Sequence, residues 1–323
     1  MRRSALLALA CCTLAPVFNP ARADDPPPVE MGALARGFAL PAVGRPEVLT
    51  PGALRQRVYL NDTNEYTARD NADESILLDG EATLLTYEVR YGLTDRWEAG
   101  AYVPLLSQGG GFLDSIIQGW HSAWGLPQGG RDEAPKNKYR YLYVRNGQTL
   151  LNVDQGSVTF GDLRLTTGYQ ILPNLAARAM LQLPTSDASH LSGSGAAGGA
   201  AWLDGAVPLS GWLHWLKLYG SMGYSYTGTG DIISGQQEHS LLFGAAGLGV
   251  QFTRRWDAKL QVYFHGAPYK DSGLAALDHV AAPLTVSTSY RVTPKTAVSL
   301  GFQEKANIFA SPDFGVFLGV TLD

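Results

Sequence analysis

Five short turns recur along the chain, and each joins two stretches in which apolar and polar side chains alternate. These turns are Thr94-Asp95-Arg96, Leu172-Pro173-Asn174, Leu209-Ser210-Gly211, Thr253-Arg254-Arg255 and Thr293-Pro294-Lys295. Longer connections rich in Gly, Ser and Asp lie between consecutive short turns. Alternation, with short turns at one end of the strands and long loops at the other, is typical of an antiparallel barrel that crosses an outer membrane.

The alternating stretches predict twelve strands. Their ranges are 54–66, 76–91, 97–106, 157–171, 175–184, 196–207, 212–227, 239–252, 256–266, 282–292, 297–305 and 313–322. An even number of strands places both ends of the barrel on the side of the short turns, as bacterial barrels require. The predicted fold class is therefore all-β: a transmembrane, antiparallel, up-and-down β-barrel of about 12 strands with a long, partly helical extracellular loop.

Alternation alone does not separate a membrane barrel from a soluble β-sandwich, which also buries one face of each strand. Unequal loop lengths at the two ends favour the membrane barrel. Aromatic residues also gather near the short turns, where an interfacial girdle is expected because amphipathic rings prefer the headgroup boundary. The predicted girdle comprises Tyr91, Trp97, Tyr169, Trp212, Trp256 and Tyr290.

The N-terminus has the pattern of an export signal. Arg2 and Arg3 precede an apolar run, and Ala21-Arg22-Ala23 provides a small-residue cleavage site, so residues 1–23 are predicted to be a signal peptide. Residues 24–53 are Pro-rich and aperiodic; we interpret them as a flexible periplasmic segment, with a partial plug of the barrel as the alternative. Residues 54–323 form the predicted barrel, and the expected location is the bacterial outer membrane.

Composition excludes several classes of site. Both cysteines, Cys11 and Cys12, fall inside the signal, so the exported part can contain no disulfide, thiolate nucleophile or cysteine-ligated metal. The formal net charge of −4 argues against a nucleic-acid partner. The histidines show no metal-ligand spacing. We therefore expect no cofactor and no metal site.

The polar faces of the strands carry charges of both signs and are predicted to line the lumen. The predicted lumen-lining residues are Glu88, Arg90, Glu98, Asp162, Arg164, Arg178, Lys217, Asp257, Lys259 and Arg291. The favoured interpretation is a neutralised network of ion pairs that fills a narrow interior. The alternative is a polar conduit, since a barrel of this size lies between filled barrels and open channels.

The longest connection, residues 107–156, has a pattern of its own. Its apolar residues Leu113, Ile117 and Trp124 recur at helical spacing, and a hairpin is predicted for Tyr139–Val144 and Gln148–Val153 across Asn146-Gly147. Folded loops of this length usually serve a function. We expect the helix to narrow the mouth of the barrel. The predicted constriction comprises Phe112, Ile116, Trp120 and Trp124.

Three segments carry a resemblance to a known family. They are LDGEATLLTYEVRYGLTDRWEAGAYVP (78–104), GGGFLDSIIQGWHSAWGLPQGGRD (109–132) and FGDLRLTTGYQ (160–170). The chain resembles an uncharacterised family of bacterial outer-membrane proteins, the domain of unknown function numbered 3187. The resemblance implies an outer-membrane barrel and no assigned activity, so it transfers no catalytic residue. The terminal Leu322-Asp323 departs from the final aromatic residue that is usual in such barrels.

Asp114, His121 and Ser122 are weak catalytic candidates. A carboxylate, an imidazole and a hydroxyl together could perform acyl transfer, as in an outer-leaflet lipid hydrolase. However, a helix separates Asp114 from His121 by about 10 Å along its axis. The sequence leans away from an enzyme.

The leading functional hypothesis is a small channel, or a barrel that binds and transports a solute, gated by the 107–156 connection. A structural or lipopolysaccharide-interacting barrel is a further alternative, because Lys136, Lys138, Arg140 and Arg145 could bind lipid phosphates. The expected partners are outer-membrane lipids, lipopolysaccharide, the barrel-assembly machinery and a small solute of unknown identity.

Overall fold

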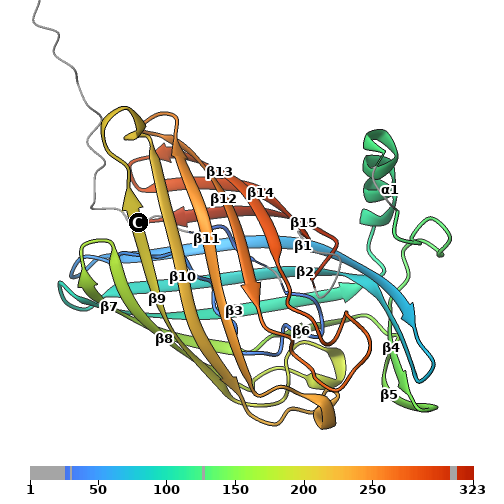
Figure 1. The fold of residues 1–323 in the computed structure, drawn as a ribbon. Helices are drawn as coiled ribbons and strands as arrows, with labels where there is room; N and C mark the ends of the chain where they lie inside the picture. Colours follow the sequence, from blue (N-terminus) through green and yellow to red (C-terminus); the bar gives the residue numbers. More distant parts are fainter. Residues whose placement is uncertain (1–25, 30, 126–127, 306–310) are drawn as a thin grey trace, which may run out of the picture.

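The computed structural model describes residues 26–29, 31–125, 128–305 and 311–323, so the predicted signal peptide lies outside the described residues. Its main feature is a closed antiparallel barrel of twelve strands (Figure 1). These strands are β1 (Leu54–Asp70), β2 (Glu74–Gly92), β3 (Trp97–Gly109), β7 (Leu163–Leu172), β8 (Leu175–Leu183), β9 (Gly198–Pro208), β10 (Leu216–Thr227), β11 (Ser240–Gln251), β12 (Trp256–His265), β13 (Pro283–Thr293), β14 (Thr296–Lys305) and β15 (Phe314–Leu322). Pairing of β1 with β15 closes the barrel, and the predicted fold class is confirmed.

The predicted strand 157–171 is interrupted. Its first part, β6 (Ser157–Phe160), pairs with Leu105–Gln108 of β3, and β7 pairs with Trp97–Tyr102 of the same strand. The interruption lies opposite Pro104, whose nitrogen cannot donate to the strand ladder. Gly161 instead donates its N–H to the Pro104 carbonyl at 2.9 Å. The wall therefore contains a local irregularity between β6 and β7.

The outward face of the barrel is apolar. Along β1 and β2, the exposed large apolar side chains occupy alternate positions, as the pleat of a strand requires. They are Leu54, Val58 and Leu60 on β1 and Leu85, Tyr87 and Tyr91 on β2. Near the short turns, Trp97 and Tyr169 are paired across β3 and β7 with ring centroids 4.9 Å apart. No helix in the described parts of the chain is long and apolar enough to span a bilayer.

The long connection contains the helix and the hairpin that its pattern predicts. Helix α1 (Leu113–Trp124) ends at Gly125, which adopts a left-handed conformation. Strands β4 (Arg140–Arg145) and β5 (Gln148–Val153) are joined by Asn146 and Gly147, both with positive φ, as a type I′ turn requires. The hairpin extends the sheet at the extracellular end of β2. Short 3₁₀ helices occur at Ala188–His190, Gly211–Leu213 and Ser234–Gln236.

The N-terminal segment runs inside the barrel, not beneath it as a tail. In Figure 1 its dark blue chain passes within the ring of strands. Its apolar residues Met31, Leu34, Phe38, Leu40 and Val43 are buried in a cluster with side chains of the wall and the extracellular loops. The described residues 31–49 are called the plug below. The flexible-tail interpretation does not describe this segment, because the barrel interior supplies apolar and polar partners that the sequence alone does not reveal.

Candidate functional site

An ion pair joins the plug to β2. The guanidinium of Arg45 donates to the Glu88 carboxylate at 2.8 Å, and it also donates to the Tyr102 hydroxyl at 2.5 Å. All three side chains are buried. A buried charge is tolerated only when it is paired and hydrogen-bonded, so this pairing fixes where the plug crosses the lumen.

Arg178, on β8, is the centre of a second group of contacts. Its guanidinium lies 2.5 Å from Glu98 and 3.0 Å from Asp204. It also donates to the plug carbonyls of Arg45 (3.0 Å) and Glu47 (2.8 Å). One arginine from the wall therefore binds two wall carboxylates and the plug backbone together.

The wall also accepts hydrogen bonds from the plug amides. Gly44 donates its N–H to Asp204 at 2.8 Å, Leu49 donates to Glu98 at 2.8 Å, and Val48 donates to Gln170 at 2.8 Å. Gly44 has a φ of +101°, a conformation that a residue with a side chain rarely adopts. These contacts satisfy plug amides that would otherwise be buried without partners.

The upper part of the plug packs beneath the extracellular loops. The Tyr269 hydroxyl donates to the Leu34 carbonyl at 3.0 Å, and its ring contacts the edge of Phe38 at 5.7 Å between centroids. Burial raises the pKa of Tyr269, so its hydroxyl keeps the proton that it donates. Ala39 donates its N–H to Thr227 at 3.1 Å. The lumen is therefore filled at this level by packed side chains.

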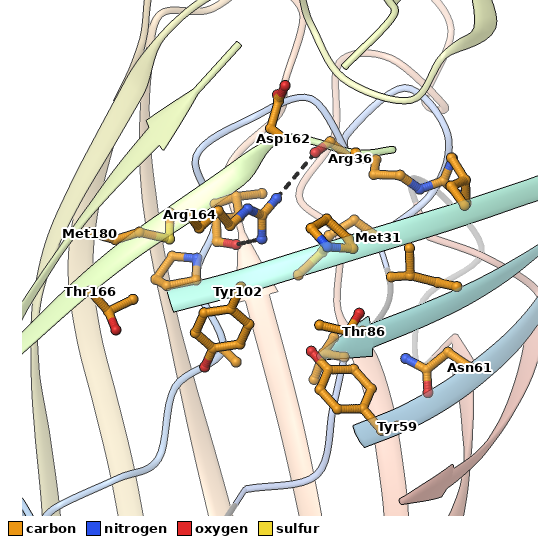
Figure 2. A pocket seen from close by; sticks show the side chains of 18 of the residues that line it. Met31, Arg36, Tyr59, Asn61, Thr86, Tyr102, Asp162, Arg164, Thr166 and Met180 are labelled. Carbon is orange, nitrogen blue, oxygen red and sulfur yellow. Dashed lines mark hydrogen bonds between the residues drawn. The ribbon is translucent and has the colours of Figure 1, made fainter. Parts of the chain in front are cut away.

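A cavity of about 80 Å³ remains between the plug and the wall. Figure 2 shows Tyr59, Tyr102 and Thr86 on one side of it, with Met180 and Arg164 on another. The Arg164 guanidinium donates to the Leu40 and Arg36 carbonyls of the plug at 3.1 and 3.4 Å. The cavity lining combines apolar side chains with cations and hydroxyls.

The predicted lumen-lining residues fall into two groups in the structure. The buried ones are Glu88, Arg90, Glu98, Asp162, Arg178 and Lys259, and the half-buried ones are Arg164, Lys217, Asp257 and Arg291. The sequence analysis missed Asp204 and Arg45. Asp204 follows Ala200 and Trp202 at alternate positions of β9, so periodicity could have identified it. Arg45 lies in an aperiodic segment and carries no comparable signal.

Helix α1 lies outside the barrel wall, beyond the β1–β2 ribbon (Figure 1). The Glu81 carboxylate accepts hydrogen bonds from the N–H groups of Phe112 (3.1 Å) and Leu113 (2.7 Å), and the Asn64 amide donates to Asp114 at 3.1 Å. Asn64 and Glu81 continue the outward alternation of Leu60 and Leu85, which explains the external position.

The structure therefore places the residues of the predicted constriction away from the mouth of the barrel. The four residues assigned to it are all exposed, on α1 or immediately before it, and away from the lumen: Phe112, Ile116, Trp120 and Trp124. The physical reason is that their helix is anchored by side chains on the outward face of β1 and β2. No periodicity within the loop itself encodes that choice.

The three catalytic candidates have other contacts. The two oxygens of Asp114 accept from Asn64, Arg131 and the N–H of Asn137. The Ser122 hydroxyl accepts a hydrogen bond from Gln128 at 3.0 Å. The Asp114 carboxylate thus anchors α1. This role differs from the predicted one, in which the carboxylate would orient the His121 imidazole for acyl transfer.

Comparisons with known proteins agree with this architecture. Residues 4–323 match the model of the family described as Protein of unknown function (DUF3187). The chain belongs to this family. A search of curated proteins found no match to the sequence. The resemblance drawn from the three sequence segments is thus confirmed.

A solved structure of low sequence identity shares the fold. The COG4313 outer membrane channel from Pseudomonas putida F1 is 16% identical, with a TM-score of 0.54; the match covers 88% of this chain and 97% of that one. The toluene transporter TbuX of Ralstonia pickettii (9% identity, coverage 95% and 99%, TM-score 0.43) and a Pseudomonas aeruginosa FadL homologue (11%, coverage 89% and 99%, TM-score 0.43) also match. The fold of this chain is that of an outer-membrane β-barrel.

Proposed function

We propose that this protein is a passive channel for small solutes, closed at rest by its own N-terminal plug. The observation that carries the proposal is the crossing of the lumen by residues 44–49, which are held chiefly by polar contacts with the wall. In this proposal the plug is the gate, and the 107–156 connection is not, because α1 is anchored on the outer face of the wall.

The chemistry of these contacts suits a displaceable gate. A buried ion pair gains little net stability over its hydrated components, because desolvation of both charges offsets most of their attraction. When the lower plug leaves the wall, Glu88, Glu98 and Arg178 can be hydrated by the water that enters the lumen. The apolar upper plug, including Phe38 and Leu40, provides most of the resistance to opening.

The cavity beside the plug indicates the class of solute. Leu84, Leu106 and Met180 provide an apolar surface, while Arg164 and Tyr102 provide hydrogen-bond donors. This combination suits a small molecule with an apolar body and an anionic or hydrogen-bond-accepting group. Because the cavity is small, such a solute would pass only as the plug moves aside.

A reversible covalent lock tests the plug as gate. A Cβ built on Gly198 lies 2.8 Å from the Cβ of Ala39, so the pair Ala39→Cys and Gly198→Cys needs only a small separation to reach disulfide geometry of about 4 Å. No cysteine follows Cys12 in the sequence, which leaves this pair without competitors in the exported chain. We expect solute uptake into proteoliposomes to fall severalfold on oxidation and to recover on reduction.

The single variants Ala39→Cys and Gly198→Cys, treated with the same oxidant, are the matched controls and should show no change. A chain lacking residues 113–124 should retain its uptake, since α1 does not cover the lumen. Equal uptake by the oxidised and reduced double variants would contradict the proposal that the plug moves during passage. Absence of uptake in all forms, including a chain lacking residues 26–49, would contradict the channel itself.

A further inference from the structure

Helix α1 presents an apolar stripe that no part of the described chain covers. Phe112, Ile116, Trp120 and Trp124 are 60, 53, 52 and 67% exposed. The rings of Trp120 and Trp124 contact each other, with centroids 5.5 Å apart. Exposing four large apolar side chains in one row to water is unfavourable in free energy, so we expect the stripe to contact an apolar environment.

The helix is held firmly in its external position. On its wall side, Leu113, Asp114 and Ile117 are buried. Arg131 forms ion pairs with Asp114 and Asp313, and its guanidinium lies over the Tyr66 ring at 5.2 Å. Moving α1 to the lumen would break these buried contacts. The stripe is therefore expected to contact an apolar environment with the helix in its external position.

The depth of α1 follows from the β2 strand. Leu85 is the last large apolar residue on the outward face of β2 before Thr83 and Glu81, and Glu81 binds the first turn of α1. Four residues of a strand tilted as in membrane barrels cover on the order of 10 Å along the membrane normal. The helix therefore begins above the last lipid-facing leucine by somewhat more than the thickness of one headgroup layer, which is about 5–7 Å.

We propose that α1 is an interfacial helix whose stripe of Phe112, Ile116, Trp120 and Trp124 is immersed in the outer leaflet of the membrane. The occupant of this surface is bilayer lipid, because the helix is anchored on the outward face of the same ribbon whose Leu60 and Leu85 face lipid. Tryptophan rings prefer this boundary, where their apolar body meets hydrocarbon and their N–H meets headgroups. The opposite side of the helix, with Asp114, Gln118 and Ser122, faces the wall and the aqueous side.

Site-directed labelling tests this placement without reference to transport. A polarity-sensitive fluorophore is attached to Ile116→Cys, on the stripe, and to Ser122→Cys, an exposed position on the polar side of the same helix. The proteins are reconstituted into vesicles of phosphatidylcholine and phosphatidylglycerol. Quenching is measured with a phospholipid carrying a nitroxide at a shallow acyl position and, separately, with aqueous iodide.

We expect the lipid nitroxide to quench the label at Ile116→Cys roughly threefold or more above that at Ser122→Cys, because an interfacial helix buries one face by several ångströms. Iodide should show the reverse order. Trp124→Cys provides a second stripe position in case the first variant assembles poorly, and heat-dependent electrophoretic mobility verifies the folded barrel for each variant.

Two results would overturn the proposal. If iodide reaches both helix faces equally, α1 stands clear of the membrane. If the stripe label is shielded from both quenchers, and the shielding falls when the protein is diluted in lipid, the stripe contacts a second copy of the chain. Neither result bears on solute uptake, so this test and that of the plug can fail independently.

Discussion

The plug and helix α1 are two apolar-rich segments that the same ribbon of β1 and β2 places on opposite sides of the wall. Glu65 of β1 accepts the N–H of the plug residue Ala33 at 3.1 Å. Asn64, its neighbour in the chain, donates to Asp114 of α1. Successive side chains of a strand point to opposite faces, so these two contacts lie inside and outside the barrel.

This contrast explains why the two segments bury their apolar residues differently. Phe38 and Leu40 of the plug are almost completely buried among protein side chains, whereas Trp120 and Trp124 of α1 remain exposed on the outer surface. A barrel in a membrane has two apolar environments, its packed interior and the surrounding lipid. The polar anchor of each segment selects which of the two environments its apolar side chains meet.

The largest effect is expected from removing the centre of the inner network. Arg178→Met leaves the Glu98 and Asp204 carboxylates buried without this cation, which typically costs about 3–5 kcal/mol. We expect the free energy that holds the lower plug in place to fall by most of this amount. Faster hydrogen exchange of the Gly44 and Leu49 amides, both donors to these carboxylates, would measure the loss.

Arg291→Met is the matched control for that experiment. Arg291 lies near a short turn, where its guanidinium contacts the Arg254 carbonyl at 3.5 Å. Its replacement should leave the exchange of the plug amides unchanged. Protection of Gly44 and Leu49 that survives Arg178→Met would mean that apolar packing alone secures the plug.

A smaller effect is expected at the outer anchor. Arg131→Met removes the ion pairs to Asp114 and Asp313. The loss of these hydrogen bonds between charged groups should lower the free energy that holds α1 against the wall by about 2–3 kcal/mol. Limited proteolysis within residues 113–124 would accelerate, while the plug amides keep their protection. Lys136→Met, which removes a 3.5 Å contact to Ser115, is the control. Loosening of the plug together with α1 would show that the two anchors are coupled across the strand.

The smallest effect is expected from the turn in the plug. Gly44→Ala places a Cβ 3.2 Å from the Tyr219 ring at a φ of +101°, and this should weaken plug docking by about 1–2 kcal/mol. Gly249→Ala on β11 is the control, because its Cβ would meet ordinary contacts at 3.7 Å or more. Hydrogen exchange of the Val48 and Leu49 amides measures plug docking in both variants. Equal exchange in the two variants would show that the plug does not depend on this turn.

The strand pattern was predictable from the sequence to within a few residues, and the break at Pro104 shows where that prediction ends. Within residues 157–171 the exposed apolar side chains shift from even positions (Val158, Phe160) to odd positions (Leu165, Ile171), and at this shift the partner strand has a proline that cannot complete the ladder. Strand pairing brings residues from distant parts of the sequence together, so a defect can originate in the neighbouring strand. The same limit applies to Arg45, whose partner Glu88 becomes evident only when the barrel closes around the plug.

Local periodicity was sufficient to predict the antiparallel strands, their short turns, α1 and the β4–β5 hairpin, because these depend on residues close in sequence. It could not predict that residues 31–49 fill the lumen or that α1 lies outside it. Both placements rest on contacts between residues far apart in sequence, such as Gly44 with Asp204 and Leu113 with Glu81. An apolar pattern predicts that a segment is buried, but the polar groups that anchor the segment determine where it is buried.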